Sequence, residues 1–170
     1  DVCSSDLFEQ GLIDEETFSG FQDNYQYYVP LKGQAKDEGG KPKGTGMGFN
    51  IKGKESIAAL GRKSRAESPL LHAYLDTQKA ITRGHKNEVG NALLNLIEEA
   101  PNPELWSAYT TEGPLERKKG PDGKIKMVPM SKEKMSALSS NPQSEWFTTK
   151  RDGMEYYIKI DDPVLAMQMK

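Results

Sequence analysis

The chain contains little cysteine and little histidine. Its 170 residues include one cysteine, Cys3, and two histidines, His72 and His85. A single thiol excludes an internal disulfide, and two well separated histidines without thiolate partners are too few for a zinc cage. We therefore predict no metal site and no cofactor.

The chain also has no long hydrophobic run. No stretch approaches the roughly 18 consecutive apolar residues of a membrane span, and no signal-peptide pattern opens the chain. Hydrophobic residues make up 35% of the sequence and the mean hydropathy is -0.73. We expect a soluble domain with a thin core that is not exported by a signal of its own.

The two ends of the chain differ from the rest. Residues 1–7 (DVCSSDL) resemble translated adapter sequence at the end of a metagenomic reading frame, so we set them aside as an artefact. The apolar run at residues 164–167 suggests that the sequence continues in a longer protein. The predicted organisation is one domain over residues 8–170, as a fragment of that protein.

A long helix is the clearest element of the sequence. Ser68 and Pro69 signal its start, because a serine hydroxyl accepts from the free amides of the first turn and proline suits the first helical position. Prolines 101 and 103 end it, which predicts a helix from Pro69 to about Glu99.

Apolar residues along this helix recur at spacings of three and four, which predicts one buried stripe. Gly84 and Gly90 interrupt the stripe at about 1 kcal/mol each, and burial of the large side chains should offset this cost. The stripe comprises Leu70, Tyr74, Ile81, Val89, Leu93, Leu96 and Ile97, flanked by Leu71 and Leu75.

Shorter elements surround the long helix. Asp14 is a capping residue for a short helix ending near Asn24, and Asp161 or Asp162 before Pro163 starts another helix near the C-terminus. Residues 34–48, rich in glycine and lysine, predict a flexible loop.

Two hairpins complete the pattern. One covers residues 115–129 around a Gly-Pro-Asp-Gly turn, and the other covers residues 145–160 around Asp152-Gly153, a pair favoured in type I′ turns. The fold class predicted is α+β: a long central helix with a short N-terminal helix and small antiparallel β-hairpins.

The formal net charge of -2 conceals strong local blocks. Residues 32–65 hold nine bases and three acids, and residues 114–134 hold seven bases and three acids. The first block suggests a nucleic-acid-binding patch, because phosphate contact requires positive charge and reach. The other interpretation is a solvated face or a partner for the acidic N-terminus. The candidate residues are Lys52, Lys54, Arg62, Lys63 and Arg65.

Residues 48–55 approach the pattern of a phosphate-binding loop. Glu55 stands where that loop needs a serine or threonine hydroxyl, Ser56 comes one residue late, and no hydrophobic strand leads into the first glycine. An acidic helix end at residues 98–104 has no matched second carboxylate pair for acid–base chemistry. We therefore predict a basic loop here and no catalytic residues.

Several segments together resemble a known family. They are residues 11–17, 28–32, 48–51, 59–64 and 83–94, followed by the Asp-Gly hairpin with Ile158-Lys159-Ile160. Over roughly residues 11–170 the chain resembles a large polyvalent protein-associated domain, the thirty-eighth type of that series. The resemblance implies a part of a very long protein of a tailed phage or mobile element. Such domains occur beside helicase, methyltransferase, protease or antirestriction modules, and are thought to travel with the injected DNA.

This resemblance implies no catalytic residues and suggests a non-enzymatic scaffold or interaction domain. Its partners would be other domains of the same polypeptide, phage proteins or DNA, in the virion or the host cytoplasm. The alternative is an accessory nucleic-acid-binding domain that uses the patch at residues 52–65. A third hypothesis is an NTPase remnant at residues 48–55.

Overall fold

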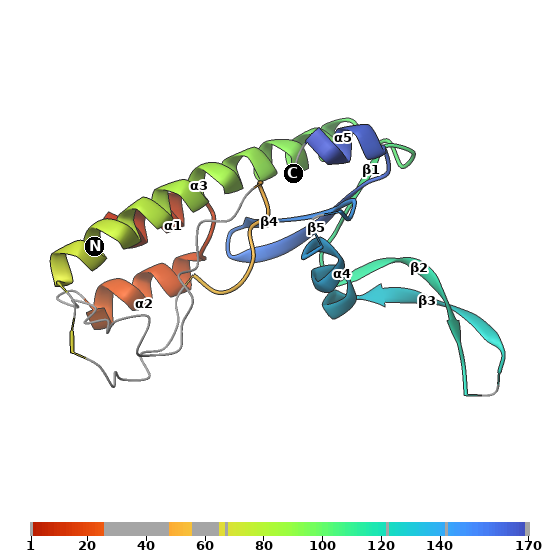
Figure 1. Cartoon of the computed structure of the whole chain (residues 1–170), viewed down its shortest axis with the longest axis horizontal. Helices are drawn as coiled ribbons and strands as arrows, with labels where there is room; N and C mark the ends of the chain where they lie inside the picture. The colour runs from red at the N-terminus through yellow and green to blue at the C-terminus, as the bar shows by residue number, and fades with distance from the viewer. Residues whose placement is uncertain are drawn as a thin grey trace.

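The computed structural model describes residues 2–25, 48–55, 65–66, 68–121, 123–141 and 143–168. The elements are α1 (Val2–Glu9), α2 (Glu15–Tyr25), α3 (Pro69–Glu99), β1 (Trp106–Tyr109), β2 (Glu112–Lys119), β3 (Ile125–Ser131), α4 (Lys132–Ser139), β4 (Trp146–Arg151), β5 (Met154–Ile160) and α5 (Pro163–Gln168). This arrangement confirms the α+β class (Figure 1). The predicted loop at 34–48 lies outside the described residues.

The bounds of α3 agree with the prediction. The helix begins at Pro69 and ends at Glu99, where the Ala100 amide donates to the Leu96 carbonyl. The Ser68 side chain makes no capping hydrogen bond, so proline at the first position provides the start signal.

The prediction of the buried face of α3 was largely wrong. The buried positions are Ala80, Gly84, Asn87, Gly90, Leu94 and Ile97, and of these only Ile97 belongs to the predicted stripe. Leu70, Leu71, Tyr74, Leu75, Ile81, Val89 and Leu96 are exposed, whereas Leu93 packs partly buried against the core. Small residues line the contact face because α1 and β4 pass close to the helix backbone.

A three-stranded sheet with the order β1-β5-β4 packs against the second half of α3. Both pairings are antiparallel, with Trp106 opposite Ile160 and Phe147 opposite Ile158. Ile158 and Ile160 join Leu94 of α3 in one hydrophobic cluster, as the alternation in the second hairpin predicts. Trp106 packs against the same cluster and donates through Nε1 to the Ala100 carbonyl, at 3.1 Å.

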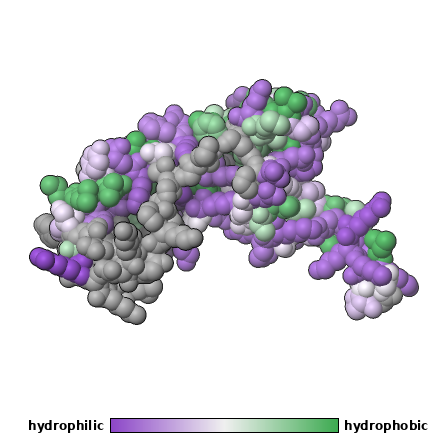
Figure 2. Space-filling view, viewed as in Figure 1, coloured by the Kyte–Doolittle hydropathy of each residue, from purple (hydrophilic) through white to green (hydrophobic). Residues whose placement is uncertain are grey.

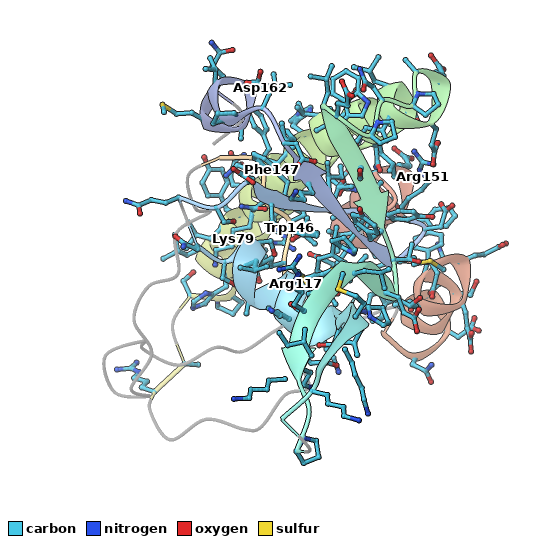
Figure 3. All side chains as sticks on the ribbon, turned by 90° about the vertical axis from the view of Figure 1, so that its right-hand side faces the viewer. Lys79, Arg117, Trp146, Phe147, Arg151 and Asp162 are labelled. Carbon is cyan, nitrogen blue, oxygen red and sulfur yellow. The ribbon has the colours of Figure 1, made fainter. Side chains whose placement is uncertain are left out.

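The opposite face of this sheet is covered by α4. Met135, Trp146 and Tyr157 form a second buried cluster there. Trp146 and Phe147 are neighbours in β4 and therefore enter different clusters on opposite faces (Figure 3). Neither α4 nor β1 was predicted from the sequence.

The remaining two strands form a sheet of their own. β2 and β3 pair only with each other among the described residues, with Lys118 opposite Lys126 and Lys119 opposite Ile125. This hairpin confirms the predicted one, and it projects away from the rest of the molecule (Figure 1). We call residues 112–131 the arm.

α1 packs against α3, and α2 packs against α1 (Figure 1). Residues 2–7, set aside in the sequence analysis, form most of α1, and Phe8 stacks on Phe18 of α2 with ring centroids 4.8 Å apart. Asp14 caps α2 as predicted, accepting from the Thr17 amide at 2.8 Å. Among the described residues, no helix combines the length and apolar composition needed to cross a membrane.

Candidate functional site

Asn87 of α3 connects the helix to the edge strand of the sheet. Its side chain is fully buried, and its Nδ2 donates to the carbonyls of Gln10 and Lys150, both at 2.7 Å. Its Oδ1 accepts from the Lys150 amide at 2.8 Å and from the Thr149 hydroxyl at 2.9 Å. The amide thus pairs with β4 as a neighbouring strand would, and every polar atom of the side chain is used in the fold.

Residues 48–55 cover the same edge of the sheet at Thr148, two residues before Lys150 along β4. The Ile51 amide donates to the Thr148 carbonyl at 2.8 Å, and Asn50 Oδ1 accepts from the Thr148 amide at 2.9 Å. Ile51 itself is completely buried. This part of the glycine-rich segment therefore lies along a strand, where its backbone groups are engaged by β4.

Glu55 joins this segment to α3 and β4 through ion pairs. Its side chain is 4% exposed and receives Arg83 through two bonds, from Nε at 2.8 Å and Nη2 at 2.6 Å. Lys150 Nζ donates to the same carboxylate at 2.9 Å and to the Gly53 carbonyl at 2.7 Å. A carboxylate held in this way stabilises the fold, because removing it would leave two partly desolvated cations.

The predicted basic patch divides into residues with different environments. Lys52 Nζ donates to the Ser136 carbonyl at 2.7 Å and to the Ser140 hydroxyl at 2.6 Å, so it links residues 48–55 to α4. Lys54 and Arg65 are exposed. Arg62 and Lys63 lie outside the described residues.

The two glycines of α3 lie where other elements cross the helix closely. A Cβ added at Gly90 would lie 2.4 Å from Thr149 Oγ1, and one added at Gly84 would lie 2.7 Å from Gln10 Cγ. Together with Arg83 and Asn87, these glycines place much of the segment 83–94 in packing contacts. This segment, one of those that carry the family resemblance, is therefore structural at these four positions.

A shallow polar hollow of about 430 Å³ lies between α1, α3 and the Asp-Gly turn. Arg151 lines it, and its guanidinium contacts Glu98 at 3.0 Å and Asn95 Oδ1 at 2.6 Å. Within the described ranges, no group of three or more His, Cys, Asp or Glu side chains could hold a metal ion. The hollow is lined by Phe8, Glu9, Gln10, Gly11, Glu88, Asn91, Asn95, Arg151 and Asp152.

The outer half of the arm concentrates exposed positive charge. Residues 117–127 contain five cations and one acid, Asp122. All five cations are exposed, and hydrophilic side chains dominate the arm in the surface view (Figure 2). Nitrogen-tipped side chains extend from the hairpin into the surroundings (Figure 3). The cations are Arg117, Lys118, Lys119, Lys124 and Lys126.

The base of the arm is fixed to the body through α4. Lys134 forms an ion pair with Glu116, and Met135 is fully buried where the added Cβ of Gly113 would meet its sulfur at 2.7 Å. Ser131 ends β3 and caps α4, accepting from the Lys134 amide. The arm is therefore anchored at its base and exposed at its tip.

A partly buried hydrogen bond within β5 lies next to α4. The Tyr157 hydroxyl donates to Glu155 Oε2 at 2.9 Å, and Lys132 of α4 lies 3.3 Å from the same oxygen. Burial and this hydrogen bond raise the pKa of Tyr157 to about 12. Burial alone would raise the pKa of Glu155, but the hydrogen bonds from Tyr157 and Lys132 outweigh it and hold that pKa below its ordinary value.

The fold and its charged surface define a small α+β domain with a basic two-stranded arm. Comparison with family models, curated proteins and solved structures found no match. The resemblance to a large polyvalent protein-associated domain therefore stays a prediction. The positive charge of residues 114–134 and the hairpin over residues 115–129 were each predicted from the sequence, but separately. Their coincidence was the signal for this candidate site.

Proposed function

We propose that this chain is a non-enzymatic interaction domain that binds nucleic acid as an accessory part of a long phage polyvalent protein. The observation that carries this proposal is the set of five exposed cations on one projecting hairpin. Lysine and arginine that neutralise phosphates supply affinity without reading sequence. The family resemblance supports the setting, because such domains are thought to act near injected DNA.

The test is fluorescence anisotropy of a labelled DNA titrated with the 170-residue chain. If about four phosphates are neutralised, the logarithm of the binding constant should fall with the logarithm of salt concentration with a slope of about -4. Absence of binding at about 50 mM salt would overturn the proposal.

A second candidate function is a protein scaffold, and a different observation favours it. Leu70 and Tyr74 in the first two turns of α3 are 82% and 62% exposed, and Leu71 and Leu75 are exposed beside them. A green patch marks this end of α3 in the surface view (Figure 2). Clustered exposed apolar side chains suit contact with another domain of the same polypeptide.

Hydrogen exchange would test the scaffold function in the chain alone and in a version extended into its neighbouring domain. Slower exchange of amides in residues 70–75 in the extended version is the expected result. Equal exchange in both versions would contradict a docking role for this face.

A further inference from the structure

We propose that the arm is a β-ribbon that binds double-stranded nucleic acid in a groove. This inference rests on the proposed function and assigns it to one element and one class of partner. It also places the binding site away from residues 52–65, which the sequence suggested as an alternative nucleic-acid-binding patch.

The first argument is the placement of cations on the two strands. Lys118 lies directly opposite Lys126, and Arg117 and Lys119 lie two residues apart on the other face of β2. Residues two apart on a strand are separated by roughly 7 Å, which equals the rise of about two base pairs along the duplex axis. Two strands about 5 Å apart also pass into a major groove about 12 Å wide.

This arrangement of cations lowers the stability of the hairpin itself. Like charges directly opposite each other destabilise a strand pair, and a two-stranded hairpin is marginal on its own in water. Lys118 and Lys126 break this rule in the exposed half of the arm. A phosphate placed over the face that carries both lysines would be attracted to both of them, and rule violations of this kind are expected at functional sites.

The same arm also carries exposed apolar side chains. Ile125 is 68% exposed and Met127 is 56% exposed, on the face that also carries Arg117 and Lys119. In the major groove, an apolar side chain can contact the methyl group of thymine while neighbouring cations contact phosphates. An acidic peptide would use the cations but would not require this combination on a narrow ribbon.

The test compares two variants of the whole chain that each lose four positive charges. The arm variant carries Lys118→Gln, Lys119→Gln, Lys124→Gln and Lys126→Gln. The patch variant carries Lys54→Gln, Arg62→Gln, Lys63→Gln and Arg65→Gln. Because the change in net charge is equal, a difference in affinity reports the position of the cations.

Each variant is titrated into a labelled 20-base-pair DNA duplex, into a single strand of the same length and into poly-glutamate at about 100 mM salt. We expect duplex to bind more tightly than the other two probes. The arm variant should bind duplex at least tenfold more weakly, with a salt slope smaller by about 3, while the patch variant stays within threefold of the original chain.

Three outcomes would overturn the inference in distinguishable ways. If the patch variant loses affinity and the arm variant keeps it, nucleic-acid binding stands and the arm is not its site. If the single strand or poly-glutamate binds more tightly than duplex, the assigned partner is wrong. If the original chain binds no DNA, the proposed function fails as well. Circular dichroism melting confirms folding of both variants. The patch variant should melt as the original chain does, and the arm variant at the same temperature or higher, because glutamine removes the repulsion between Lys118 and Lys126.

Discussion

At the scale of single residues, Asn87 shows how a polar side chain can define a fold. It is a fully buried polar residue of α3, and it satisfies the Gln10 carbonyl just after α1, the Lys150 backbone of β4 and the Thr149 side chain. A sheet edge next to a helix would otherwise carry unpaired backbone groups. The asparagine supplies both a donor and an acceptor to Lys150, which no apolar residue of similar size could do.

Replacing Asn87 should therefore be costly. Asn87→Ala leaves two carbonyls and one amide without their partners in a buried place, and we expect a loss of about 3–4 kcal/mol in the free energy of unfolding. Urea unfolding followed by circular dichroism measures this loss. Glu88→Ala is the matched control, since its side chain is 68% exposed and should change stability by less than about 0.5 kcal/mol. Equal effects from the two substitutions would contradict the role of Asn87.

Substitution by alanine should have opposite effects on stability at Gly90 of α3 and at Gly20 of α2. Gly90→Ala gains about 1 kcal/mol of helix propensity, but its Cβ would collide with the side chain of Thr149, which is buried. We expect a net loss of about 1–2 kcal/mol in the free energy of unfolding. Gly20→Ala in α2 meets no atom within 4 Å and should stabilise by about 0.5–1 kcal/mol. Thermal melting of both variants tests the contrast, and stabilisation by Gly90→Ala would show that the contact is looser than described.

At the scale of elements, helix ends and tight turns were predicted correctly because they depend on residues that are close together in the sequence. The bounds of α3, the capped start of α2 and the Asp152-Gly153 hairpin follow from proline, aspartate and glycine at particular positions. Asp152 and Gly153 have φ values of 52° and 75°, as a type I′ turn requires. These features need no knowledge of distant residues.

The contact face of α3 could not be predicted in the same way. Periodicity selects large apolar side chains, whereas this helix uses Ala80, Gly84, Asn87 and Gly90 to let α1 and β4 approach. The four residues of β1 owe their conformation to pairing with β5, about fifty residues away. For α4 a signal was present: Ser131 as a cap, followed by Met135 and Leu138 three residues apart.

The candidate site shows the same limit. The charge of the arm is evident from the sequence, but its projection from the body depends on β2 and β3 pairing only with each other among the described residues. Lys52 looked available because its contacts with Ser136 and Ser140 join residues more than eighty positions apart. Charge alone could not distinguish a cation that holds the fold from one that is free to bind a ligand.

The contact between β5 and α4 predicts a pH dependence. The pKa of Tyr157 is raised from 10.0 to about 12, so between these values the unfolded chain loses the phenol proton while the folded chain keeps it. Stability therefore falls as pH rises through this window. Tyr157→Phe removes this contribution, and its free energy of unfolding should decline less steeply. Urea unfolding from pH 9 to about 12 measures both slopes, and parallel curves would contradict the assignment.

At the scale of the whole molecule, stability and the proposed binding surface are separate. The two hydrophobic clusters draw on α3, α4, α5 and the three-stranded sheet, and among the described residues of the arm only Met130, at its base, packs against them. The exposed half of the arm, residues 117–127, belongs to neither cluster. A surface that is not required for folding can hold like charges directly opposite each other without unfolding the domain.

Shortening the arm tests this separation directly. Glu116 lies opposite Val128, so an Asn-Gly turn that replaces residues 117–127 can close the hairpin at that pair. The Lys134–Glu116 ion pair and the buried Met135 are retained. Because the removed residues bury little apolar surface, the free energy of unfolding should change by less than about 1 kcal/mol, whereas DNA affinity should fall at least as far as in the four-glutamine arm variant. Thermal melting and anisotropy on the same preparation measure both quantities. A loss of several kcal/mol would mean that the arm supports the core, and unchanged DNA affinity would place the binding surface on the body of the domain.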